Sequence, residues 1–196
     1  MGRHALDTIA PTLGVTVVGD GKLTLAEATS ASGVVRVNVA AGTTATVVFT
    51  GTAGSVTKTV VGNGTAQAVT LDTVNLIALG QGQVSVLTTV ADVAGNVSSS
   101  STGGFILDTV GPASPAPSLA ADTGASSIDR ITKNGTINAA GVEANATLQF
   151  STNSGSTWNP AAGTSFTLAE GNYAANAVQV RQIDAAGNIS GAGVLA

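Results

Sequence analysis

The chain of 196 residues contains no cysteine, a single histidine and few aromatic or charged side chains. Without cysteine it can form neither a disulfide framework nor a thiolate metal site. The only histidine, His4, lies in the short polar start of the chain, so neither a Ser-His-Asp triad nor a histidine zinc site can be assembled. Aromatic residues make up 3% of the chain, too few to line the cleft of a glycosidase. We predict that the protein is not an enzyme.

Charge is also scarce: charged residues make up 9% of the chain, and the formal net charge is −4. So few Lys and Arg side chains argue against binding to nucleic acids or to anionic membrane surfaces. No run of 18 apolar residues is present, so the sequence predicts no membrane span. Residues 1–5 are too polar and short for a signal peptide, and we expect them to be a leader on a piece of a longer protein.

What the chain does contain is an internal repeat. "LDTIAP" at 6–11 returns as "LDTVGP" at 107–112, and "ATVVFT" at 45–50 returns as "ATLQFS" at 146–151. The phrase "DVAGNVS" from Asp92 returns as "DAAGNIS" from Asp184, after a shorter interval. We therefore predict two tandem domains, residues 1–107 and 108–196, with a linker over about 108–117.

Each repeat has the pattern of β-structure. Short runs rich in Val and Thr, often alternating, end at Gly or Asn, as in "GVVRVNVA", "TATVVFTG", "GQVSVLTTVAD" and "NAVQVRQID". No stretch combines helical apolar spacing with capping residues, so we expect no helix. About seven short strands in each repeat predict an all-β fold of two immunoglobulin-like Greek-key β-sandwiches.

The sequence resembles the bacterial immunoglobulin-like tandem repeats of giant RTX-type adhesins and biofilm-associated surface proteins. The second repeat carries the fuller signature, in "LDTVGPASPAPSLAADTGASSIDRITKNGT", "NATLQFSTNSGSTWNP" and "VQVRQIDAAGNIS". The first repeat matches at "LDTIAP" and "DVAGNVS" and has "GDGKLTLAEA" in place of "ADTGASSIDRIT". The resemblance implies an extender segment of a secreted protein at the bacterial cell surface.

The positions of the acidic residues predict calcium sites. Most of the eleven acids fall in predicted turns or at domain ends, and Ca²⁺ is bound by carboxylate, carbonyl and amide oxygens. The alternative, that each Asp or Asn only caps a turn, remains open for any single residue. The candidate ligands are Asp7, Asp20, Glu27, Asp92, Asn96, Asp108, Asp122, Asp129, Glu143, Asp184 and Asn188.

Sandwich topology suggests how these ligands assemble. We expect one junction to collect Asp20 or Glu27, Asp108, Glu143, Asp184 and Asn188 from both domains. Asp92 and Asn96 would form the equivalent half-site beside Asp7, facing a preceding repeat. Asp122 and Asp129 would face a following repeat or hold a site within their own loop.

Two functions from different classes follow from these patterns. In the first, calcium stiffens a spacer that projects a distal adhesive domain for cell adhesion and biofilm formation, with neighbouring repeats of the same chain as partners and a monomeric state. In the second, the sandwiches bind carbohydrate or another ligand. Only Trp158 and Tyr173 could serve such a site; we expect Trp158 in the core and Tyr173 as a corner or core tyrosine. Asp72 and Glu170 are expected to be turn or surface acids.

Overall fold

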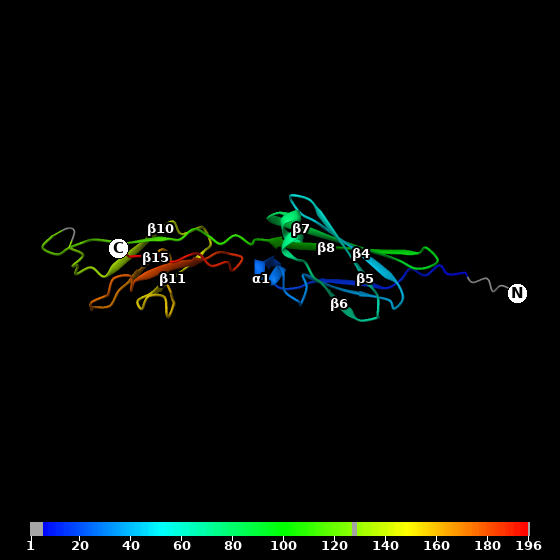
Figure 1. Cartoon of the computed structure of the whole chain (residues 1–196), viewed down its shortest axis with the longest axis horizontal. Coiled ribbons are helices and arrows are strands. Elements are labelled where there is room, and N and C mark those ends of the chain that lie inside the picture. The colour runs from blue at the N-terminus through cyan, green and yellow to red at the C-terminus, as the bar shows by residue number, and fades with distance from the viewer. Residues whose placement is uncertain (1–5, 127–128, 196) are drawn as a thin grey trace. The chain divides into compact units, whose positions relative to one another are not determined.

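The computed structural model describes residues 6–126 and 129–195, with only the backbone described at 101 and 102. The predicted leader, including His4, lies outside these residues. Contacts divide the chain into two compact parts, unit 1 (Met1–Thr109) and unit 2 (Val110–Ala196). Figure 1 shows the strands of both units as arrows.

Unit 1 is a β-sandwich. Its smaller sheet has the order β1-β3-β6, formed by Leu13–Val17, Val35–Val39 and Ala66–Val69. Its larger sheet has the order β2-β8-β7-β4-β5, formed by Lys22–Leu23, Val97–Leu107, Gly82–Ala91, Thr44–Thr50 and Ser55–Val61. The connections from β3 to β4, β5 to β6 and β6 to β7 each pass from one sheet to the other, which gives a Greek key.

Unit 2 repeats this strand order with shorter strands, except that its larger sheet has four strands where that of unit 1 has five. Its smaller sheet has the order β9-β10-β13, formed by Ala116–Leu119, Thr136–Ala140 and Ser165–Thr167. Its larger sheet has the order β12-β11-β14-β15, formed by Asn159–Pro160, Thr147–Ser151, Gln179–Ile183 and Gly193–Val194. The predicted all-β sandwich fold is confirmed for both repeats.

The alternation that predicts the strands also builds the cores. In β3 and β4 every second side chain is buried, so Val35, Val37 and Val39 face Ala45, Val47 and Phe49 across the sandwich. In unit 2 the core is smaller and centres on Ile137, Leu148 and Val180, beside a stacked pair, Phe150 and Phe166, with ring centroids 4.2 Å apart. Burial of these aliphatic and aromatic side chains is the main source of stability in a chain without disulfides.

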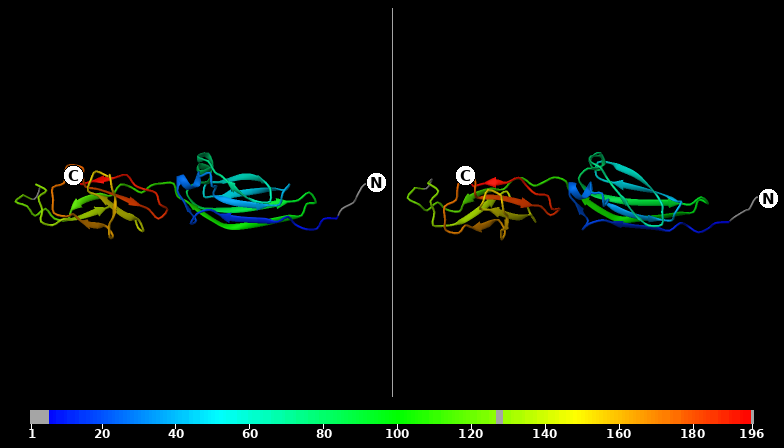
Figure 2. Two further views of the ribbon diagram at one scale, coloured as in Figure 1. Left: turned by 90° about the horizontal axis from the view of Figure 1, so that it is seen from below. Right: turned by 60° about the horizontal axis from the view of Figure 1, so that its bottom comes forward.

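The expectation that the chain has no helix is wrong, because unit 1 contains two short ones. Both α1 (Leu25–Ala28) and α2 (Thr73–Leu79) begin with a capping box, formed by Thr24 with Glu27 and by Asp72 with Asn75. Figure 2 shows them at one end of the unit. Asp72 is therefore a helix N-cap. The motifs Thr-x-x-Glu and Asp-x-x-Asn are visible in the sequence, but the helices they start are too short for apolar periodicity to reveal.

Candidate functional site

The repeated Asp-x-x-Gly-Asn phrase forms the same closed loop in each unit. In the unit 1 tip loop (residues 92–96), one carboxylate oxygen of Asp92 accepts the backbone N–H groups of Ala94 and Asn96, each at 2.9 Å. The other oxygen accepts the Asn96 side-chain amide at 2.9 Å. Gly95 has a φ of 88°, a value that a residue with a Cβ atom rarely adopts. The spacing of Asp, Gly and Asn is thus what closes this loop.

The unit 2 tip loop (residues 184–188) has the same construction. One Asp184 oxygen accepts the N–H groups of Ala186, Gly187 and Asn188 at 2.8, 2.8 and 2.9 Å, and the other accepts the Asn188 side-chain amide at 3.0 Å. In both loops the Oδ2 atom of the aspartate accepts one of these bonds, and a carboxylate oxygen can accept a second donor or a cation.

Hydrogen bonding keeps both tip-loop aspartates ionised. The side-chain amide of Asn96, followed by backbone N–H groups, lowers the pKa of Asp92 below the ordinary value of 3.8 against partial desolvation. For Asp184, desolvation raises the pKa, but the Asn188 amide and the N–H groups of the loop together outweigh it, so the pKa is also lowered. The hydrogen bonds of each loop therefore favour the ionised form of its aspartate.

In unit 1 the tip loop holds the incoming chain (Figure 1). The Asn96 side chain donates to the carbonyl oxygen of Asp7 at 3.1 Å, and the Ser98 hydroxyl donates to that of Pro11 at 2.6 Å. Asp7 itself accepts the N–H of Ile9 at 3.1 Å. The structure therefore brings Asp7, Asp92 and Asn96 together at one end of the unit.

In unit 2 the incoming segment is held by a buried glutamine, Gln182. Gln182 is fully buried, its side-chain oxygen accepts the N–H of Glu143 at 2.7 Å, and its amide donates to the carbonyls of Ala113 and Gly141 at 2.7 and 3.0 Å. It thus ties the β10–β11 loop and the incoming segment to β14, two residues before Asp184. Gln182 is not among the residues predicted from the sequence. The available signal was a polar residue at an inward-facing position of the alternating strand "VQVRQI".

The incoming segment of unit 2 packs closely on its last residues. A Cβ atom added to Gly193 would overlap the carbonyl oxygen of Pro115, and one added to Gly191 would lie 2.6 Å from the Ser114 hydroxyl. Gly111 similarly approaches the carbonyl oxygen of Ile189. The proline-rich segment from 111 onward is therefore part of the folded unit and is not a free hinge.

The acids at the other end of unit 1 cap local structure. Asp20 accepts the N–H of Lys22 at 3.0 Å, and Glu27 accepts the N–H and hydroxyl of Thr24 at 2.9 and 2.8 Å. Asp108 follows β8, and its N–H donates to the carbonyl of Leu23 at 3.0 Å. These three acids lie around β2 and α1, each with a local structural role or contact.

The β9–β10 loop of unit 2 holds Asp122 and Asp129. One Asp122 oxygen accepts the N–H of Arg130 at 3.0 Å, and Asp129 accepts those of Ser126 and Ile131 at 3.2 and 3.0 Å. The second Asp122 oxygen is buried and has no hydrogen-bond partner among the described residues. A buried carboxylate oxygen without a donor is costly unless a cation neutralises it. Of the candidate residues, this loop fits a hard cation best.

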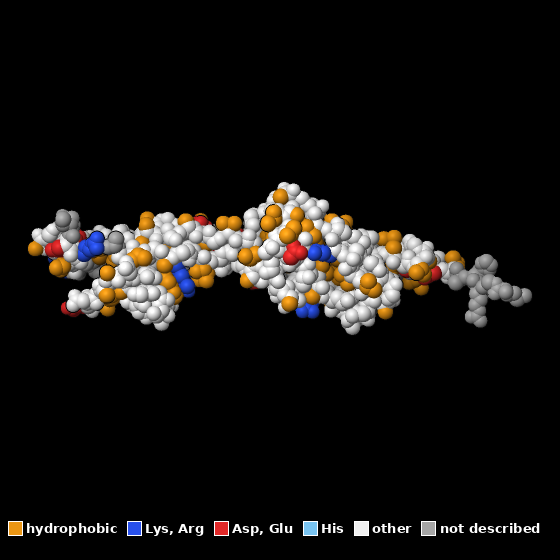
Figure 3. Space-filling view, in the orientation of Figure 1, with side chains coloured by type: hydrophobic (Ala, Val, Ile, Leu, Met, Phe, Trp, Pro, Cys, Tyr) orange, Lys and Arg blue, Asp and Glu red, His pale blue; other side chains and the backbone are white. Residues whose placement is uncertain are grey.

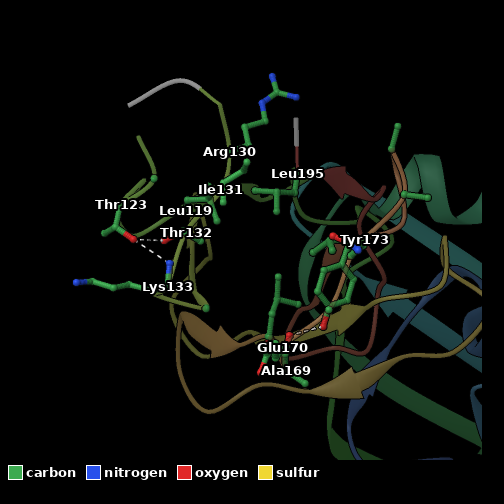
Figure 4. Close-up of a pocket in the computed structure, with 18 residues that line it drawn as sticks. Leu119, Thr123, Arg130, Ile131, Thr132, Lys133, Ala169, Glu170, Tyr173 and Leu195 are labelled. Atoms are coloured by element: carbon green, nitrogen blue, oxygen red, sulfur yellow. Dashed lines mark hydrogen bonds between the residues drawn. The ribbon is translucent and has the colours of Figure 1, made fainter. Parts of the chain in front are cut away.

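A hollow of about 880 Å³ lies beside this loop, between it and residues 168–175 (Figure 4). On its far wall the Tyr173 hydroxyl donates to the carbonyl of Ala169 at 2.9 Å, and the ring packs against the core of unit 2, which confirms the predicted corner tyrosine. Glu170 is exposed at the rim.

The prediction that Trp158 lies in the core is wrong. Trp158 is half-buried outside the hydrophobic cluster of unit 2, and the Arg181 guanidinium lies 4.3 Å from its ring centroid. Arg181 also donates to the side chain of Gln149 at 2.8 Å. The tryptophan follows a turn and packs on the polar outer side of β11 and β14.

Within residues 6–126 and 129–195, no group of three or more His, Cys, Asp or Glu side chains is arranged to hold a metal ion. No helix in this part of the chain is both apolar and long enough to cross a membrane.

Charged side chains are few and scattered on the face of each unit drawn in Figure 3, where uncharged atoms make up most of the surface.

No family model matches the chain, and no curated protein matches it in sequence. Solved structures do resemble it. One belongs to a 1.5-MDa bacterial ice-binding adhesin studied for its retention at the host cell surface, with 20% identity, 95% of this chain and 63% of that chain covered, and a TM-score of 0.45. Another is a tetra-tandem repeat from the extending region of a large adhesion protein, with 21% identity, coverage of 98% and 51%, and a TM-score of 0.38.

A third similar structure is a Ca²⁺-stabilised adhesin that helps an Antarctic bacterium reach out and bind ice, with 20% identity, coverage of 96% and 50%, and a TM-score of 0.47. This chain spans between half and 63% of the length of these three structures. The chain is similar to tandem repeats of large bacterial adhesins.

Proposed function

We propose that the chain is a non-enzymatic spacer of a large bacterial surface adhesin, stiffened by Ca²⁺ and projecting a distal adhesive domain for adhesion and biofilm formation. The observation that carries the proposal is that each unit binds its own incoming segment. In unit 1 Asn96 and Ser98 hold residues 7–11, and in unit 2 Gln182 holds Ala113. A linker integrated into the following sandwich leaves few freely rotating bonds between repeats.

The proposal includes two calcium-binding sites. The β9–β10 loop offers Asp122 and Asp129, where a cation would compensate the buried, unpaired Asp122 oxygen. At the junction of the predicted domains, 1–107 and 108–196, the candidate ligands are Asp20 or Glu27, Asp108, Glu143, Asp184 and Asn188. Support for this second set comes from unit 1, where Asp7, the counterpart of Asp108 in the repeated phrase, lies beside Asp92 and Asn96.

Calcium binding is tested by isothermal titration of the chain with CaCl₂ after EDTA treatment. We expect saturable binding and a rise in Tm, because a ligand bound only by the folded state stabilises it. Mg²⁺ should substitute poorly, since it requires a smaller octahedral shell. Asp122→Asn should weaken or remove one site, whereas Glu170→Gln, the same charge change on an exposed acid of unit 2, should not. No heat of binding and an unchanged Tm would contradict the calcium part of the proposal.

Stiffening is tested separately by small-angle scattering. We expect the ensemble of orientations between the units to narrow in Ca²⁺ relative to EDTA, and Asp184→Ala to widen it while both units stay folded. Asp92→Ala should leave it unchanged, because Asp92 belongs to the other end of unit 1. Scattering curves that change neither with calcium nor with Asp184→Ala would refute a calcium site that stiffens the junction. The proposal would then be reduced to a spacer stiffened by its linker contacts alone.

Carbohydrate binding is the second candidate, and one observation favours it. Trp158 is half-buried outside the core and lies with Arg181 and Gln149 on one side of unit 2, a combination of aromatic and polar groups that suits sugars. A glycan array, repeated with Trp158→Ala, tests this. Retention of a glycan that depends on Trp158 would favour this function over the spacer.

A further inference from the structure

The outer face of the larger sheet of unit 1 carries no charge across β4, β5 and β7. In these strands buried side chains alternate with exposed ones, so every second residue points outward. The single charged residue of the three strands, Lys58, lies two positions from buried Val56 and Val60 and therefore points to the same inner side as they do. We call the outward side of these strands, with the start of β8, the neutral face.

Strand register arranges the neutral face in rows. Thr46 lies opposite Thr59 on β5 and Thr89 on β7. In the next row Val48 lies between Thr57 and Leu87, and Leu87 is 47% exposed in the middle of the sheet. The centre of the face is therefore apolar and surrounded by hydroxyl groups.

One end of the face is apolar as well. The row through Thr44 contains Val61 and Ala91, and Ala91 lies opposite Val97 on β8. Val61 and Val97 are 67% and 57% exposed. Apolar side chains at the centre and depletion of charge are features of the buried part of a protein interface.

We propose that the neutral face docks, side by side, against the neutral face of a second copy of this chain. A charged partner would lose hydration here and find no opposite charge to offset the loss. The same face of another copy meets the requirement for a flat, uncharged, apolar partner, and a two-fold axis lets each row meet its equivalent. Two pleated sheets pack in this way at a separation of about 10 Å.

The size of the face predicts a weak contact. Four strands spaced about 4.8 Å apart and about seven residues long cover roughly 500 Å², so two copies bury roughly 1,000 Å² in total. That area lies at the lower limit for specific interfaces and suits transient association. In a chain with many such repeats, weak contacts add up through multivalency. The contact uses none of the candidate calcium ligands. A failure of this proposal would therefore not contradict the proposed function, and the reverse also holds.

Sedimentation velocity of the whole chain from about 10 μM to 1 mM tests the proposal, in Ca²⁺ and in EDTA. We expect the weight-average sedimentation coefficient to rise with concentration in both buffers, with a Kd of roughly 0.1–1 mM. Leu87→Lys should weaken association at least tenfold, because it places like charges against each other. The matched control, Val74→Lys, adds the same charge at an exposed apolar position of α2 and should behave as the wild type.

A charge-swap experiment makes the test specific to this face. Leu87→Lys and Leu87→Glu should each be monomeric, and an equimolar mixture should associate again. Far-UV circular dichroism checks folding of each variant. A wild-type chain that stays monomeric at 1 mM, an equal loss of association with Val74→Lys, or a mixture no more associated than its components would each overturn the proposal.

Discussion

Gln182→Met is the most informative single substitution in unit 2. Gln182 is fully buried, and its side chain makes three hydrogen bonds that join the Glu143 loop, Gly141 and the incoming segment at Ala113. Methionine has a similar length and flexibility, so it fills most of the space and leaves only a small cavity. The substitution therefore removes the polar contacts while keeping most of the packing.

The expected loss of stability follows from these contacts. A typical net contribution of about 1 kcal/mol for each hydrogen bond gives about 3 kcal/mol for the three together. The Glu143 N–H and the two carbonyls become unpaired, which adds to the loss where water cannot reach them. With a urea dependence of about 1–3 kcal/mol per M, the unfolding midpoint should fall by roughly 1–3 M. Unit 2 should remain folded in water but become the weaker part of the chain.

Intrinsic fluorescence in urea measures this change in unit 2 alone, because the only Trp and the only Tyr of the chain are Trp158 and Tyr173. Gln179→Met is the matched control. It makes the same substitution on the same strand, where the side chain is half-buried and donates one hydrogen bond to the carbonyl of Asn176. A midpoint shift for Gln182→Met no larger than that of the control would refute the assignment of Gln182 as the residue that holds the incoming segment.

Three further predictions concern single residues. Thr88→Val should raise the free energy of unfolding of unit 1 by about 1 kcal/mol, measured by urea unfolding followed by far-UV circular dichroism, because the fully buried Thr88 hydroxyl has no hydrogen-bond partner among the described residues; no gain would contradict this. Gly193→Ala should lower the urea midpoint of unfolding followed by fluorescence, because its Cβ atom would overlap the Pro115 carbonyl oxygen. Gly163→Ala is the control: its Cβ atom would have no atom within 4 Å, so any loss of stability there comes from the positive φ alone. The pKa of Asp184 in the folded state is below 3.8, so the stability that its ionised form contributes is present above that pH and is lost as pH falls toward the folded pKa. Asp184→Asn should therefore be less stable than the wild type at pH 7, and the difference in free energy of unfolding should shrink in acid. A difference that does not change with pH would refute the hydrogen-bonded loop.

The sequence was informative about the candidate site where a motif is local. The recurrence of Asp, Gly and Asn at fixed spacing predicted two equivalent loops, and each loop is closed by hydrogen bonds within five residues. It was uninformative where contacts are long-range. Gln182 binds Ala113 and Gly141, which are distant in the chain, and nothing local in the sequence indicates that a glutamine in a strand has this role. Trp158 was assigned to the core for the same reason: its position over Arg181 depends on which side of the sheet the preceding turn places it.

The repeat and the fold class can be read from the sequence, because the two-residue alternation of Val and Thr fixes which side of each strand is buried before any strand finds a partner. The sequence did not reveal α1 and α2, whose capping motifs are short, nor the long β8, whose run of Ser and Thr lacks an apolar pattern. The order of strands in each sheet, the burial of Gln182 and the assembly of the neutral face from β4, β5, β7 and the start of β8 all depend on contacts between distant segments. The physical reason is that hydrogen-bond register and close packing act between segments far apart in sequence, where composition and local spacing contain no record of the partner.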